Sequence, residues 1–88
     1  MGIKVKRTQR ILEMVERYFE GDSNYIGAQI EGIVDEQEPS GFREIVMLYV
    51  EDINNEEYHQ TLIPFLRKAT NDDTVGFFYG FGHTLWIL

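Results

Sequence analysis

The six consecutive apolar residues at positions 45–50 constrain the fold of this chain more than any other segment. Successive side chains of a β-strand point to opposite faces of the sheet. A strand that is apolar on both faces is typical of the middle of a sheet, where both sides are covered. We therefore expect residues 42–53 to form a central strand. In it, Val46, Leu48 and Val50 would share one face, and Ile45, Met47 and Tyr49 would share the other.

A first helix is expected over residues 9–20. Ile11 and Val15 lie four residues apart, and further apolar residues widen the same stripe. Thr8 precedes the stripe and is a candidate N-cap, because its hydroxyl can accept a hydrogen bond from an early backbone N–H. Gly21 suits the left-handed conformation that ends many helices.

A second helix is expected over residues 55–69. Asn54 and Glu57 have the spacing of a capping box, in which each side chain bonds the other residue's backbone N–H. Pro64 lacks a backbone donor and clashes with the preceding turn, so we expect a kink, or a break near Ile63. The apolar stripe of this helix consists of Tyr58, Leu62, Phe65, Leu66 and Ala69.

Three more segments predict strands, at residues 25–35, 74–80 and 83–88. Ile26, Ala28 and Ile30 fall on one side of the first of them. The short polar or glycine-containing links favour hairpins and therefore antiparallel pairing. The resulting order, helix–strand–strand–helix–strand–strand, predicts an α+β fold with an antiparallel sheet of about four strands and two helices packed mainly on one face.

The length of 88 residues predicts one domain over residues 1–88, in which residues 1–7 form a short edge strand or a disordered lead-in. The chain has no cysteine, so disulfides and thiolate chemistry are excluded. This suits a reducing compartment, and we expect a cytoplasmic protein. No apolar h-region follows Arg10 and no 18-residue apolar run occurs, so we expect neither a signal peptide nor a membrane span.

The net charge of −7 is unevenly distributed. Lys4, Lys6, Arg7 and Arg10 give the first ten residues a charge of +4, so the remainder is strongly acidic. Binding to nucleic acid or to an anionic membrane requires clustered Lys and Arg, and the acidic body disfavours both. The basic first residues are the one place where an anion could dock, although a solvated helix start explains them better.

No set of residues predicts catalysis, a cofactor or a metal site. An enzyme would require His59 or His83 to meet a carboxylate such as Glu57 in a pocket, and nothing in the sequence brings them together. Residues 52–56 alternate oxygen ligands as a calcium loop does, but glutamate stands where that loop has glycine, and helix capping explains them better. We therefore expect a protein that is not an enzyme.

The C-terminal segment 76–88 is rich in aromatic residues, which are enriched at protein interfaces. Two helices cannot readily cover both faces of a sheet, so an apolar second face needs either the N-terminal segment or a partner as cover. The candidate partner-binding residues come from the sheet and from the acidic surface, and they are Phe78, Phe81, Trp86, Tyr49, Met47, Glu31, Glu36 and Glu38.

The sequence thus predicts a small acidic protein-binding module that regulates or inhibits a partner protein of unknown identity. One alternative is a nucleic-acid mimic that blocks a basic groove of a DNA- or RNA-binding protein. Another is a structural subunit of a homo-oligomer, such as a homodimer paired through its C-terminal strands. The mimic would use a surface formed by Glu31, Asp35, Glu36, Glu38, Glu51, Asp52, Glu56 and Glu57.

Overall fold

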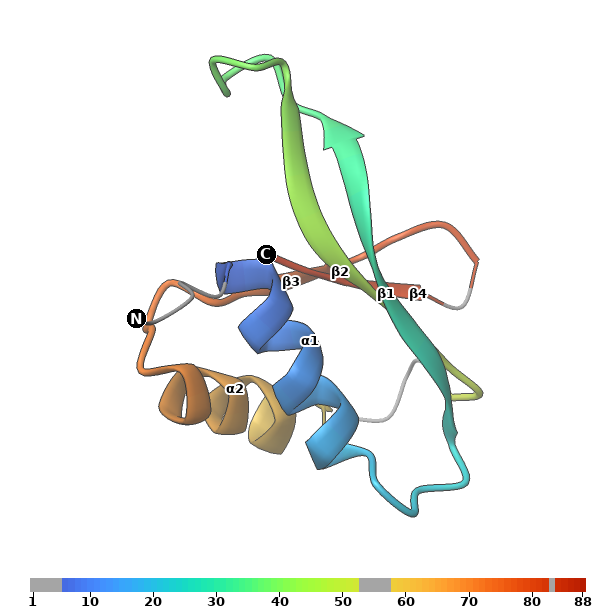
Figure 1. Cartoon of the computed structure of the whole chain (residues 1–88). Coiled ribbons are helices and arrows are strands. Elements are labelled where there is room, and N and C mark those ends of the chain that lie inside the picture. Colours follow the sequence, from blue (N-terminus) through green and yellow to red (C-terminus); the bar gives the residue numbers. More distant parts are fainter. Residues whose placement is uncertain (1–5, 53–57, 83) are drawn as a thin grey trace.

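A computed structural model of the chain describes residues 6–52, 58–82 and 84–88. Its four strands form an antiparallel sheet in the order β1-β2-β4-β3, and the helices pack on one face of it (Figure 1). This is the predicted α+β arrangement, with β2 inside the sheet. The elements in chain order are α1 (Arg7–Tyr18), β1 (Tyr25–Val34), β2 (Phe42–Val50), a π-helical turn η1 (Tyr58–Leu62), α2 (Ile63–Thr70), β3 (Phe77–Tyr79) and β4 (Thr84–Ile87).

The core lies between the helices and the near face of the sheet. Val46, Leu48 and Val50 from β2 are all fully buried there. Because side chains alternate along a strand, these three point to the same face, as predicted. The remaining buried members of the core are Ile11, Val15, Phe19, Tyr58, Leu62, Ile63, Leu66, Val75, Leu85 and Ile87.

The β1–β2 hairpin extends beyond the rest of the sheet (Figure 1). Its register joins residues from Tyr25/Val50 to Val34/Phe42, whereas β4 pairs only with residues 46–49 of β2. Beyond this point no other described strand pairs with the hairpin. Val34 and Phe42, which face each other near its tip, remain 74% and 62% exposed.

The first helix differs from the prediction at both ends. It begins at Arg7, with Lys6 at the N-cap position. Thr8 lies inside the helix and is buried, so the prediction that it caps the helix is wrong. Gly21 does have a positive φ of 78°, but it lies two residues beyond the C-cap, Phe19.

A β-bulge changes the faces of β1. Tyr25 pairs with Val50 and Gly27 pairs with Tyr49, so Ile26 is an extra residue in the ladder. The prediction that Ile26 shares the core face is wrong, since its side chain is 59% exposed. Tyr25 takes that place, and its ring stacks on Phe19 with centroids 5.2 Å apart.

The second helix is interrupted where the sequence predicts. The π-helical turn η1 ends at Leu62, and α2 begins at Ile63 with Pro64 in its first turn, where proline's missing N–H costs no helical bond. Ile63 is buried and Ala69 is exposed, so the predicted stripe is wrong at Ala69. The predicted capping pair at positions 54 and 57 lies outside the described residues.

The C-terminal hairpin is shorter than predicted. Alternation along β4 assigns Leu85 and Ile87 to the core face, and both are buried in the core. Tyr79, which the alternation also assigns to the core, is 49% exposed because β3 is the edge strand and has no neighbour on its other side among the described residues.

Candidate functional site

The face of the sheet that points away from the helices, called the outer face below, is built by all four strands. Trp86 of β4 lies at its centre, directly opposite Met47 of β2 on one side and Phe78 of β3 on the other. Met47 in turn lies opposite Gln29 of β1. Cross-strand neighbours of this kind contact one another on the face that they share. The outer face therefore carries a continuous row of side chains across the whole sheet.

The aromatic half of the outer face consists of Trp86 and Phe78. Their rings meet edge to face, with centroids 5.1 Å apart and planes at 60°. This geometry is favourable for aromatic pairs. Phe78 is still 39% exposed, and Phe81 in the following turn is 89% exposed. Large apolar surfaces thus remain accessible on and beside this half of the face.

Gly80 allows Trp86 to lie flat against the end of β3. A Cβ at Gly80 would collide with the indole ring of Trp86. Glycine in a strand often marks such a close approach. The indole Nε1 is buried and has no hydrogen-bond partner among the described residues. Such an unpaired donor costs roughly 1–3 kcal/mol, so the position of Trp86 depends on its apolar contacts.

The polar half of the outer face is a chain of hydrogen bonds. The Tyr49 hydroxyl donates to Met47 Sδ at 3.0 Å. The Gln29 amide donates to the Tyr49 hydroxyl at 3.4 Å and to Glu31 Oε1 at 2.5 Å. These bonds hold the polar side chains against the sheet. They give the apolar centre a preformed polar rim, which is the arrangement found in many protein interfaces.

The structure brings five of the eight predicted partner-binding residues together on the outer face. Phe81 lies in the turn between β3 and β4. Glu36 and Glu38 do not join them, because they lie in the turn at the far end of the β1–β2 hairpin. Gln29 was missed by sequence reasoning, although it alternates with Glu31 on the polar side of β1. The five are Glu31, Met47, Tyr49, Phe78 and Trp86.

The side chains of the outer face differ in how far they are buried. Ile45 is fully buried, whereas Met47, Tyr49 and Trp86 are partly exposed. No described helix lies over this face (Figure 1). The N-terminal segment that the sequence offers as a cover falls largely in residues 1–5, outside the described residues.

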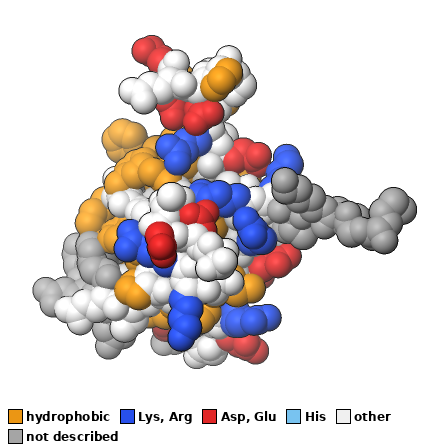
Figure 2. All heavy atoms as spheres, turned by 90° about the vertical axis from the view of Figure 1, so that its left-hand side faces the viewer, with side chains coloured by type: hydrophobic (Ala, Val, Ile, Leu, Met, Phe, Trp, Pro, Cys, Tyr) orange, Lys and Arg blue, Asp and Glu red, His pale blue; other side chains and the backbone are white. Residues whose placement is uncertain are grey.

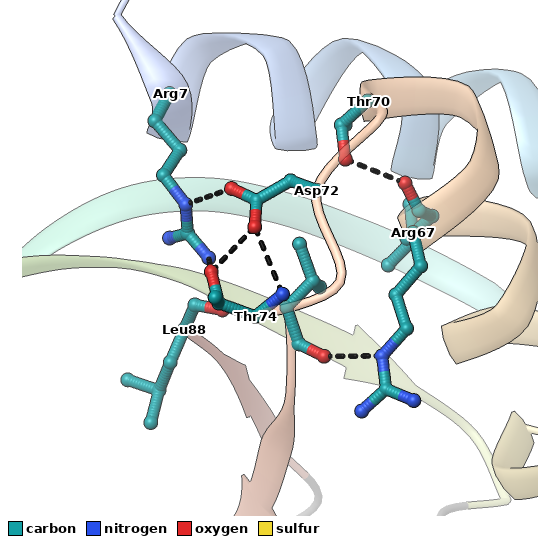
Figure 3. Close-up of polar contacts among 8 residues, drawn as sticks. Arg7, Arg67, Thr70, Asp72, Thr74 and Leu88 are labelled. Carbon is teal, nitrogen blue, oxygen red and sulfur yellow. Dashed lines mark hydrogen bonds and ion pairs between the residues drawn. The ribbon is translucent and has the colours of Figure 1, made fainter.

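A second polar cluster, the Arg7–Asp72 network, fastens the helices to the end of the sheet (Figure 3). Arg7 Nε donates to Asp72 Oδ2 at 2.7 Å, and its Nη2 donates to Thr74 Oγ1 and to the Leu88 carbonyl, each at 3.2 Å. The Thr74 backbone N–H donates to Asp72 Oδ1 at 2.9 Å. Hydrogen bonds from Thr74 and from Arg7 lower the pKa of Asp72 well below its usual range.

The sequence places Asp72 and Asp73 together in a turn, where carboxylates are commonly solvated. Asp72 is instead hydrogen-bonded by Arg7 and Thr74, and its lowered pKa makes it unsuited to general-acid chemistry. Two of the four basic N-terminal residues already face carboxylates of the same chain, since Lys6 Nζ lies 3.6 Å from Glu44. The helical side consequently shows cationic and anionic side chains interspersed rather than a basic patch (Figure 2).

The described part of the chain holds no group of three or more His, Asp or Glu side chains placed to bind a metal ion. The gap in the core between Tyr58, Leu62 and Phe77 has no room for a water molecule. The side chains of His59 and His83 lie outside the described part of the chain. Whether either histidine meets a carboxylate in an active site is therefore not tested. None of the described helices is long and apolar enough to cross a membrane.

The described acidic residues of the nucleic-acid mimic alternative are not gathered on one surface. Asp35, Glu36 and Glu38 lie at the tip of the β1–β2 hairpin, whereas Glu51 and Asp52 follow β2 at its opposite end. Positions 56 and 57 lie outside the described residues. The separation of these carboxylates does not favour a nucleic-acid mimic. The mimic alternative therefore stays a prediction.

None of the protein-family models, curated proteins or solved structures compared with this chain matches it.

Proposed function

We propose that this chain is a protein-binding module without catalytic activity, which docks a partner protein on the outer face of its sheet. The observation that carries the proposal is the row of side chains across four strands, with an apolar centre at Met47, Trp86 and Phe78. Gln29, Tyr49 and Glu31 form its hydrogen-bonded rim. Binding energy in protein interfaces concentrates in such aromatic centres, and a polar rim excludes water around them.

The exposure of the face supports the same proposal. Phe78 and Phe81 leave 39% and 89% of their surface in solvent, which a partner could bury. Glu31 is the acidic group of the rim. A complementary surface on the partner would therefore be apolar at its centre and would carry a cationic side chain opposite Glu31. A module of this kind regulates or inhibits its partner by occupying the surface that it covers.

Site-specific photo-crosslinking tests the proposal. A photoreactive phenylalanine analogue is placed at Phe78, at Phe81, or at the exposed Lys68 of α2 as a control, and each protein is irradiated in lysate of its source cells. We expect one partner to be captured from positions 78 and 81 but not from position 68. An excess of the wild-type chain should suppress capture, whereas a correctly folded Phe78→Ser/Phe81→Ser variant should not. Equal capture from position 68, or no capture from positions 78 and 81, would contradict the proposal.

A further inference from the structure

The free edge of β1 is the longest unpaired backbone in the described sheet. β1 spans ten residues and β3, at the opposite edge, spans three. No described strand pairs with the other side of β1. Proteins commonly protect such edges with lysine, proline or bulges. β1 has no lysine, arginine or proline, and its bulge lies at its start, between Tyr25 and Gly27.

The ladder with β2 determines which backbone groups of β1 are free. The Asp35 N–H donates to the Gly41 carbonyl at 2.9 Å, so these two residues form a hydrogen-bonded pair. In an antiparallel ladder such pairs recur at every second position. The pairs nearest the middle of β1 are then Glu31/Ile45 and Gln29/Met47. The residues of β1 that alternate with these hydrogen-bonded positions turn their backbone N–H and C=O groups toward the open edge. They are Ala28, Ile30 and Gly32.

We propose that this edge binds a second copy of the chain, by antiparallel pairing of β1 with β1 around a two-fold axis at Ile30. In this register Ile30 lies opposite Ile30 of the partner subunit, and Ala28 lies opposite the partner subunit's Gly32. The outward-facing groups of both copies then meet, giving about six backbone hydrogen bonds. The result is one continuous sheet through two copies, an example of strand addition to an exposed edge.

Charge distinguishes this register from its neighbours. An axis at Ile30 places Gln29 opposite the partner subunit's Glu31, and the Gln29 amide already donates to Glu31 within its own chain. An axis at Glu31 would place two carboxylates directly opposite each other, which is unfavourable. An axis at Gln29 would bring Gly32 to the partner's bulge at Ile26 and lose pairs there. The Ile30 register therefore combines regular pairing with complementary side chains.

The burial of β1 is consistent with a missing neighbour. Ala28 and Ile30 are partly exposed, while their partners on β2, Leu48 and Val46, are fully buried. Pairing would cover the first two. A two-fold axis perpendicular to the sheet would also place both outer faces on the same side. The inference itself does not depend on the function proposed for that face.

Proline substitution at the edge tests the inference. Gly32→Pro removes an N–H that β2 does not use, and Gly32→Ala is its matched control because a Cβ at Gly32 meets no atom within 4 Å. We expect sedimentation equilibrium of wild type and Gly32→Ala to show twice the 10.3 kDa chain mass at high concentration. Gly32→Pro should stay at the chain mass with an unchanged circular dichroism spectrum. A wild type that stays at the chain mass, or a Gly32→Pro variant that dimerises equally well, would overturn the inference.

Amide hydrogen exchange of the wild type keeps the test independent of how well the variant folds. The amides of Ala28, Ile30 and Gly32 should become protected as concentration rises, whereas those of Gln29 and Glu31 are protected by β2 throughout. Added salt should strengthen dimerisation, because each copy carries a net charge of −7. Equal exchange of the three amides in dilute and concentrated samples would refute pairing at this edge.

Discussion

The two faces of β2 carry similar residues in different surroundings. Val46, Leu48 and Val50 lie beneath α1 and α2 and are fully buried. Met47 and Tyr49, on the outer face, stay partly exposed. Since both sets are largely apolar, the position of the helices rather than composition separates them. The helical face buries its apolar surface in the core, whereas part of the apolar surface of the outer face stays exposed, and the proposed function assigns that part to binding.

Substitutions at neighbouring residues of β2 should give the largest difference in stability between the two faces. Leu48→Ala removes a fully buried side chain from the core and should lower the free energy of unfolding by about 2–5 kcal/mol. Met47→Ala removes a side chain of similar size that is already partly exposed, and it should cost roughly half as much or less. Urea denaturation of the two variants measures the difference. Equal losses would mean that the outer face is packed as tightly as the core.

A smaller loss of stability is expected when Gly80 is replaced. Its lack of a side chain sets the position of the outer-face aromatic pair, Trp86 and Phe78. Gly80→Ala would force the Trp86 indole to move and should cost about 1–3 kcal/mol, as other overpacked sites do. Gly76→Ala is the matched control, because a Cβ there meets no atom within 4 Å. Trp86 is the single tryptophan of the chain, so its fluorescence reports the displacement directly. Unchanged fluorescence, with stability equal to that of Gly76→Ala, would show that the indole does not depend on this glycine.

The helix and strand order could be predicted because it rests on local periodicity. The interruption at Pro64 and the split of β2 into two faces follow from single-residue chemistry and from alternation. The reversal at Ile26 could not be predicted, because Tyr25 and Ile26 are both apolar and either could face the core. Arg7 and Asp72 are separated by 65 positions, so their pairing depends on the finished fold.

The candidate site could likewise be predicted only in part. Alternation alone places Met47, Tyr49 and Trp86 on a common face once the strands are correctly assigned. The register that makes Trp86 adjacent to both Met47 and Phe78 is a tertiary property. Glu36 and Glu38 lie apart from this face at the tip of the β1–β2 hairpin, because β4 pairs with only part of β2, and their part in partner binding stays a prediction.

The smallest effect is expected at the margin of the helical face, where the Arg7–Asp72 network joins α1 to the end of the sheet. Asp72→Asn removes the charge that Arg7 and Thr74 stabilise. The pKa of Asp72 is lower in the folded chain than in the unfolded chain. Its contribution to stability is therefore complete above the unfolded pKa of about 3.9, and it is lost as pH falls below that value. Wild type should exceed Asp72→Asn in stability at pH 7, and the gap should shrink toward pH 3.

Asp73→Asn provides the control for this pH dependence, because it makes the same change in net charge at an exposed neighbour outside the network. If the network acts locally, the gap between wild type and Asp73→Asn should be smaller at pH 7 than the gap for Asp72→Asn. Arg7→Gln should reproduce much of the Asp72→Asn effect, since it removes the other half of the ion pair. Identical pH profiles for the Asp72 and Asp73 variants would mean that net charge, and not the attachment of α1 to the sheet, governs acid sensitivity. The helical face would then be held by apolar packing alone.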